Sequence, residues 1–146
     1  MDDKLKILVV HANEGGCAYY RALLPFRKLQ QHCNDEVEVK FNDNPLNWDV
    51  SAASATGSYP DIEWCDIMMT QNISNFGPQF MVELFKAARE AGKFIHYDTD
   101  DLLTEIYEGH RLFEVYRDRD LGHLTKNLYS NADLVTVTQK KFANRI

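Results

Sequence analysis

The sequence has little of what would fix a small fold covalently or anchor it in a membrane. Its 146 residues include three cysteines, Cys17, Cys33 and Cys65, an odd number with no Cys-x-x-Cys pair. This spacing indicates neither a disulfide framework nor a zinc site. The apolar run from Ile7 to Val10 is far too short for a signal-peptide core or a membrane span. We therefore expect a cytoplasmic protein with reduced thiols and no membrane insertion.

Positive charge is also scarce. Lys and Arg number 16 against 22 Asp and Glu, which gives a net charge of −6. This balance opposes nonspecific binding to nucleic acid or anionic lipid, so we expect no nucleic-acid partner. The chain lacks low-complexity stretches and internal repeats, and its hydrophobic residues, 45% of the total, are spread along its length. We expect residues 1–146 to form a single globular domain.

Apolar runs and alternations predict strands separated by helical segments. The first run, residues 6–11, is nearly continuous and rich in β-branched residues, a pattern typical of a parallel strand covered on both faces. We expect it to be the central strand. Further strands are predicted at residues 37–41, 66–70, 93–97 and 134–137. Because strands alternate with helices, the predicted fold class is α/β, a Rossmann-like open parallel sheet of about five or more strands with helices on both faces.

Proline and glycine mark the limits of the predicted helices. The first helix contains Pro25, which cannot bond to the carbonyl of Arg21, so we expect a kinked or two-piece helix. Gly77-Pro78 opens a later helix and Gly92 closes it. The last predicted helix pairs leucines at helical spacing, Leu121, Leu124 and Leu128.

In such sheets ligands bind beyond the carboxyl ends of the strands, which here means the loops after His11, Thr70, Tyr97 and Thr138. The first of these loops, residues 13–16, leads into a helix whose free N–H groups suit an anionic or hydroxyl-rich ligand. A tight turn explains its glycines equally well, and Glu14 would repel a phosphate. The predicted substrate-binding residues are His11, Gly15, Gly16, Arg21 and Thr138.

Arg21 is included because its planar fork of five donors suits phosphate or carboxylate, although most helix arginines are simply solvated. Asp98, Asp100 and Asp101 allow two interpretations. Acids after an apolar strand are similar to the cation sites of haloacid-dehalogenase phosphatases and metal-dependent (GT-A type) glycosyltransferases. The spacing also places Asp98 and Asp101 to cap a helix through Leu102-Leu103. We favour capping, and expect no metal and no cofactor.

Two stretches resemble the N-terminal domain of a two-domain, retaining-like (GT-B type) glycosyltransferase. One runs from Gly16 to Pro25, with small residues, Tyr-Arg and Leu-Pro in that order. The other joins Gly-Lys, an apolar strand and Tyr-Asp-x-Asp-Asp at residues 92–101 to Ala-Asp-x-Val-Thr-Val at residues 132–137. The resemblance implies that the chain contributes the acceptor side of a site for hexosyl transfer from a nucleotide sugar.

The resemblance also assigns catalytic roles to His96 and Asp98, which Tyr97 separates. It places the donor-binding residues in a second domain, which we expect to be missing after Ile146. The nucleotide sugar and acceptor would then be bound only with that domain or a partner chain, and the chain alone would be inactive. Two alternatives stay open: a freestanding carbohydrate- or nucleotide-binding module, and a metal-dependent phosphatase or transferase that uses residues 98–101. Formation of a homo-oligomer also stays open.

Overall fold

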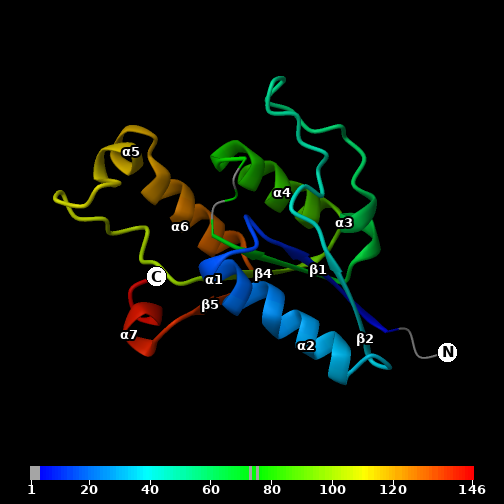
Figure 1. Ribbon diagram of the computed structural model, residues 1–146. Helices are drawn as coiled ribbons and strands as arrows, with labels where there is room; N and C mark the ends of the chain where they lie inside the picture. Colours follow the sequence, from blue (N-terminus) through cyan, green and yellow to red (C-terminus); the bar gives the residue numbers. More distant parts are fainter. Residues whose placement is uncertain (1–3, 73, 75) are drawn as a thin grey trace.

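The chain folds into one parallel sheet between two layers of helices (Figure 1). The computed structural model describes residues 4–72, 74 and 76–146. Five strands lie in these residues, in the spatial order β2-β1-β3-β4-β5. They are β1 (Leu5–Val10), β2 (Val37–Phe41), β3 (Ile67–Gln71), β4 (Phe94–Thr99) and β5 (Leu134–Val137). The predicted α/β, Rossmann-like fold class is confirmed.

The prediction that the first strand is central was wrong by one position. β1 is an interior strand, paired in parallel with β2 on one side and β3 on the other. β3 is the middle strand because β2 pairs with one side of β1, whereas β3, β4 and β5 are added in turn on its other side. The reversal between β1 and β3 is the topological switch point, the place where open α/β sheets bind ligands.

Each face of the sheet has its own core, and β1 contributes to both. Leu8 and Val10 point into the larger cluster, while Ile7 and Val9 point into the smaller one on the opposite face. This division follows from the two-residue period of a strand. It explains why β1 is apolar without interruption from Ile7 to Val10.

The larger core is covered by α3 (Pro60–Trp64), α4 (Pro78–Glu90) and α6 (Leu121–Asn131). The smaller core is covered by a helical stretch labelled α1 (Gly16–Ala18), η1 (Tyr19–Leu23) and α2 (Leu24–His32). Two short helices lie outside these layers: α5 (Phe113–Asp118) packs on α6, and α7 (Lys140–Ala143) packs on β5 (Figure 1). In the described part of the chain, no helix combines the length and the apolar character needed to cross a bilayer.

The first helix runs without a gap from Gly16 to His32 and widens to a π-helical turn just before Pro25, so the predicted kink or break stays a prediction. The turn before it, η1, is a π-helix in which the N–H of Leu24 bonds to the carbonyl of Tyr19, five residues back. Proline has no N–H to complete an α-helical bond to Arg21, and a wider turn accommodates this gap. The helix therefore changes its winding at the residues that face the strand ends.

The limits of α4 follow the predicted glycines. Gly77 and Gly92 have φ of +88° and +68°, a conformation that other residues rarely adopt, and they stand immediately before α4 and just after its end. The apolar stripe of this helix is buried: Phe80, Met81, Leu84, Phe85 and Ala88.

The predicted helix cap at Asp98 and Asp101 was wrong. Asp98 lies inside β4, and no helix begins in residues 99–112, all of which are described. The backbone after β4 instead forms tight turns, with N–H groups of Leu103 and Glu105 bonding to carbonyls two and three residues back, on Asp101 and Leu102. The Asp98 carboxylate has different partners, on other elements.

Candidate functional site

The polar residues of the sheet gather at the carboxyl ends of its strands. The loop after β1 carries His11 and residues 13–16, β3 ends in Gln71, and β4 ends beside Asp98 and Asp100. In a parallel sheet all of these ends lie along the same edge. The helical stretch that begins at Gly16 stands next to them and supplies Arg21.

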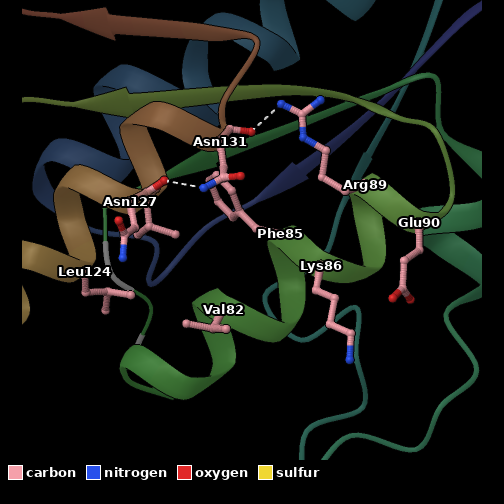
Figure 2. A pocket seen from close by; sticks show the side chains of 9 residues that line it. Val82, Phe85, Lys86, Arg89, Glu90, Leu124, Asn127 and Asn131 are labelled. Atoms are coloured by element: carbon pink, nitrogen blue, oxygen red, sulfur yellow. Dashed lines mark hydrogen bonds between the residues drawn. The ribbon is translucent and has the colours of Figure 1, made fainter.

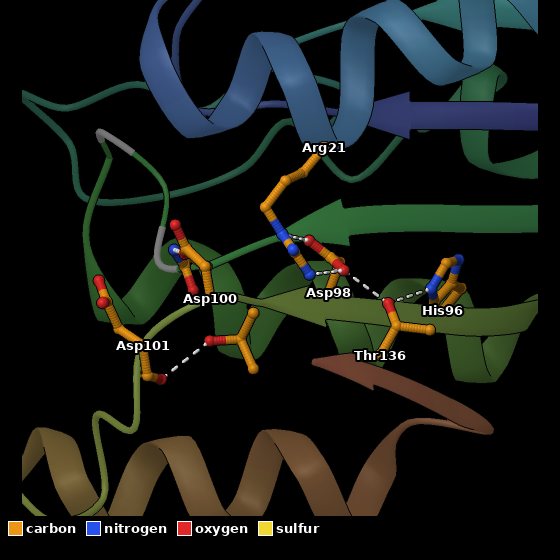
Figure 3. Close-up of polar contacts among 8 residues, drawn as sticks. Arg21, His96, Asp98, Asp100, Asp101 and Thr136 are labelled. Carbon is orange, nitrogen blue, oxygen red and sulfur yellow. Dashed lines mark hydrogen bonds and ion pairs between the residues drawn. The ribbon is translucent and has the colours of Figure 1, made fainter. Parts of the chain in front are cut away.

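Arg21 and Asp98 form a two-point ion pair at this edge (Figure 3). The Arg21 Nε and Nη2 atoms donate to the two Asp98 carboxylate oxygens at 2.7 and 2.6 Å. The Asp98 side chain is 7% exposed and the Arg21 side chain 24% exposed. This hydrogen bond to Asp98 raises the pKa of Arg21 further above its already high value. Asp98 therefore neutralises the charge of Arg21 and occupies the Nε–Nη2 edge of its guanidinium.

The network extends from Asp98 to His96 through Thr136. The Thr136 hydroxyl donates to Asp98 Oδ1 at 2.6 Å, and His96 Nε2 lies 2.9 Å from the same hydroxyl oxygen. A hydroxyl has one proton, so if it donates to the carboxylate, the His96 Nε2–H must donate to it. Burial lowers the pKa of His96 and outweighs the opposing effect of Asp98. His96 is therefore a neutral imidazole protonated on Nε2 at neutral pH.

A second polar group surrounds Asp100. Asn72 Nδ2 donates to Asp100 Oδ1 at 2.8 Å, and the Cys17 thiol lies near enough to this carboxyl to lower its pKa. Burial tends to raise the pKa of Asp100, but these neighbours together bring it below its usual value. The contact with Asp100 and the charge of that carboxylate raise the pKa of Cys17, so its thiol stays protonated. The group therefore carries one negative charge.

A small hollow opens between the loop after β1, the start of the helical stretch and the end of β3. It has a volume of about 200 Å³ and is lined by Ala12, Asn13, Gly15, Cys17, Ala18, Gln71 and Asn72. The loop is shaped by Asn13, whose Oδ1 accepts the Gly15 N–H at 3.0 Å, and by Gly16 at φ +50°. The hollow lies at the switch point between β1 and β3.

The structure brings some of the predicted site residues together and leaves others apart. Arg21, Asp98 and His96 belong to one hydrogen-bonded network, and Gly15 lines the hollow. Gly16 follows in the exposed turn, and His11 stands at its start with Nδ1 3.2 Å from the Asn13 carbonyl oxygen. Thr138 is exposed just after β5 and belongs to neither group.

Sequence reasoning missed Thr136, Asn72 and Cys17. The signal for Thr136 is register, because it pairs with Asp98 across β4 and β5 and so lies on the same face of the sheet. The signal for Asn72 is its position one residue beyond a buried strand, at φ +49°, where asparagine is among the few residues tolerated. Cys17 gave no signal, since its contact with Asp100 depends on how the helix docks.

Asp98, Asp100 and Asp101 are not arranged around a position that a cation could occupy. Both oxygens of Asp98 already accept hydrogen bonds, from Arg21 and Thr136. Among the residues that the structure describes, no three His, Cys, Asp or Glu side chains are grouped so that they could hold a metal ion. A cation at Asp98 would have to displace Arg21.

Comparison with known proteins gives no assignment: no family model, curated protein or solved structure matches this chain. Function must therefore be argued from the site.

A larger hollow, about 410 Å³, lies between α4 and α6 (Figure 2). Its floor is apolar, with Val82, Phe85 and Leu124, and Arg89 closes one end by donating to the Asn131 carbonyl oxygen at 2.6 Å. It includes no residue from the strand-end loops. Its chemistry is that of a packing groove, and the strand-end site is the better candidate for ligand recognition.

Proposed function

We propose that this chain is the acceptor-side domain of a two-domain glycosyltransferase and that its strand-end site binds a hydroxyl-rich, uncharged ligand. The observation that carries the proposal is the Arg21–Asp98 ion pair. Because Asp98 neutralises Arg21, this cation is not available to bind a phosphate. The polar side chains that remain at the hollow are carboxamides, with the Asp100 carboxylate beside them. Such groups bond well to hydroxyls, which both donate and accept.

Local charge supports a neutral ligand over a phosphate. Once Arg21 and Asp98 cancel, the charged side chains near the hollow include Asp100, Asp101 and Glu14, all negative. A diphosphate placed there would meet like charges at short range in a partly buried site. The donor nucleotide sugar then requires contacts from outside this wall, as the resemblance to GT-B enzymes implies.

In this proposal Asp98 and His96 are positioning residues. Asp98 fixes Arg21 and Thr136, and His96 holds the other side of the Thr136 hydroxyl. Their network keeps the helix, β4 and β5 at fixed distances around the cleft. Glycosyl transfer needs donor and acceptor held together in a water-poor cleft, and one α/β layer supplies only one wall. We therefore expect the isolated chain to bind without turnover.

The test uses residues 1–146 alone and fused to the donor-binding domain of a GT-B enzyme. We expect the isolated chain to show saturable NMR shifts at the strand ends with methyl glycosides, no comparable shifts with uridine diphosphate, and no sugar transfer. The fusion should gain donor affinity, and Gly16→Val should reduce that gain. Donor hydrolysis by the isolated chain, abolished by Asp98→Asn, would instead support the metal-dependent alternative. Tight sugar binding that the fused domain leaves unchanged would support a freestanding module.

A further inference from the structure

Two residues that line the hollow at the switch point, Gln71 and Asn72, each have a buried side-chain atom that lacks a partner among the described residues. Gln71 ends β3, is 4% exposed, and lines the hollow. Its Nε2 atom has no hydrogen-bond partner within residues 4–72, 74 and 76–146. The neighbouring Asn72 also lines the hollow, and its Oδ1 is likewise buried and unpaired in the described residues. Buried polar groups of native proteins are nearly always hydrogen-bonded, so we expect a water molecule or a ligand to complete these two.

The orientation of the Asn72 carboxamide follows from its neighbour. Asp100 has a lowered pKa and is ionised, so its oxygens can only accept hydrogen bonds. The atom of Asn72 that lies 2.8 Å from Asp100 must therefore be the nitrogen, which leaves the oxygen facing away from this contact. Asn72 needs a donor from the ligand, and Gln71 Nε2 needs an acceptor.

We propose that Gln71 and Asn72 recognise two adjacent hydroxyls of a neutral sugar ring. One hydroxyl accepts from Gln71 Nε2 and the other donates to Asn72 Oδ1, a pattern that a vicinal diol provides. The assignment deepens, and rests on, the proposed acceptor-side function. An imide edge of a pyrimidine base presents the same pair of groups, but a nucleotide would bring its phosphates toward Asp100 and Glu14. The lining residues Ala12, Gly15 and Ala18 are also small and form no aromatic platform for a base.

Backbone geometry makes a clean variant available. Asn72 has φ +49°, so Asn72→Gly removes the carboxamide without straining the backbone, whereas Asn72→Ala adds strain to the loss. Gln71→Glu keeps the shape of the side chain but replaces the donor with an acceptor. Gln79→Leu is a matched control, because Gln79 is exposed on α4 and does not line the hollow.

The experiment is an NMR titration of the isotope-labelled chain with three separate probes: methyl α-D-glucopyranoside, thymine and inorganic phosphate. We expect the glucoside alone to shift the side-chain amide signals of Gln71 and Asn72. Gln71→Glu and Asn72→Gly should each weaken its binding about tenfold, the equivalent of one net hydrogen bond, and Gln79→Leu should leave it unchanged. Backbone spectra of every variant establish that the fold is retained.

Thymine shifts at these two side chains would overturn the diol assignment in favour of an imide edge, and phosphate shifts would overturn it in favour of an anion. Glucoside binding that moves only signals around Arg21 and Thr136 would overturn the role of Gln71 and Asn72 and leave the proposed function standing. If the glucoside binds nowhere along the strand ends, the proposed function fails as well.

Discussion

Arg21 and Asp98 lie 77 residues apart in sequence and meet through two hydrogen bonds of 2.7 and 2.6 Å. The pair is unevenly buried, since the Asp98 side chain is 7% exposed and the Arg21 side chain 24% exposed. A carboxylate in this position cannot recover its hydration when its partner is removed. The pair therefore links the first helix to the fourth strand. Replacing Arg21 should show how much the unpaired Asp98 charge lowers the free energy of unfolding.

We predict that Arg21→Met lowers the free energy of unfolding by about 3 kcal/mol, because it leaves the Asp98 charge buried and uncompensated. The double variant Arg21→Met/Asp98→Leu should be more stable than Arg21→Met alone, since no unpaired charge remains. Urea denaturation measures both. Arg117→Met, which breaks an exposed ion pair with Asp118, is the control and should cost much less than Arg21→Met. Equal losses in the single and double variants would contradict the explanation.

The second prediction concerns His96 and pH. Burial lowers its pKa in the folded state, so between the folded pKa and about 6.5 the unfolded chain binds more protons than the native chain. Stability should therefore fall as the pH drops below about 6.5, and His96→Gln should remove this part of the dependence. Chemical denaturation of the unmodified protein and of His96→Gln is measured at pH 7 and at pH 5. The change in their stability difference between the two pH values separates His96 from the other titrating groups.

The same network predicts the proton position on His96. Nitrogen NMR at pH 7.5 should show a neutral ring protonated on Nε2, because that atom must donate to Thr136. Thr136→Val should release this constraint and mix the two tautomers. A ring protonated on Nδ1 in the unmodified protein would mean that Thr136 donates to His96 and not to Asp98.

Tyr97 provides a test in the larger core. It is fully buried against Phe85 and Tyr129, and its hydroxyl has no hydrogen-bond partner among the described residues. Tyr97→Phe keeps the ring and removes the unpaired group, so we expect it to raise the free energy of unfolding by about 1 kcal/mol. Tyr20→Phe, on the exposed Tyr20, is the control and should have no effect. A large loss of stability in Tyr97→Phe would show that the hydroxyl is bonded, most simply to a buried water.

Gly92 tests the end of α4. Its φ of +68° disfavours other residues, yet an added Cβ would have no heavy atom within 4 Å. Gly92→Ala should therefore cost about 1 kcal/mol through backbone strain alone. Gly92→Asn should cost less, because asparagine tolerates this conformation better. If alanine and asparagine cost the same in thermal denaturation, the strain argument fails.

Much of the fold could be predicted because its signals are local. β1 and β3 contain apolar runs, β2 alternates apolar and charged residues, and α4 is bounded by Gly77 and Gly92. The short helices α3, α5 and α7 were not predicted, since helices of this length depend on packing more than on propensity. The turn after Asp98 was misread because acids at a strand end can satisfy helix N–H groups or distant partners, and the sequence does not say which.

For the site, sequence reasoning could predict the edge of the sheet but not the contacts along it. Strand order and polarity indicate where ligands gather. The pairing of Arg21 with Asp98 depends on the depth at which the π-helical turn docks, and the position of Thr136 depends on the register of β5. Both are long-range properties that no local pattern contains.

The position of Thr136 on the last strand has a consequence for the growing polypeptide. Synthesis proceeds from the amino terminus, so Arg21 and Asp98 are made well before β5, which completes the hydrogen-bond set of the buried carboxylate. Until then, β4 is an unpaired sheet edge with an incompletely satisfied acid beside it. Assembly of the cleft is thus tied to the final step of sheet formation, and a nascent chain that pauses before residue 134 would be the species most exposed to aggregation.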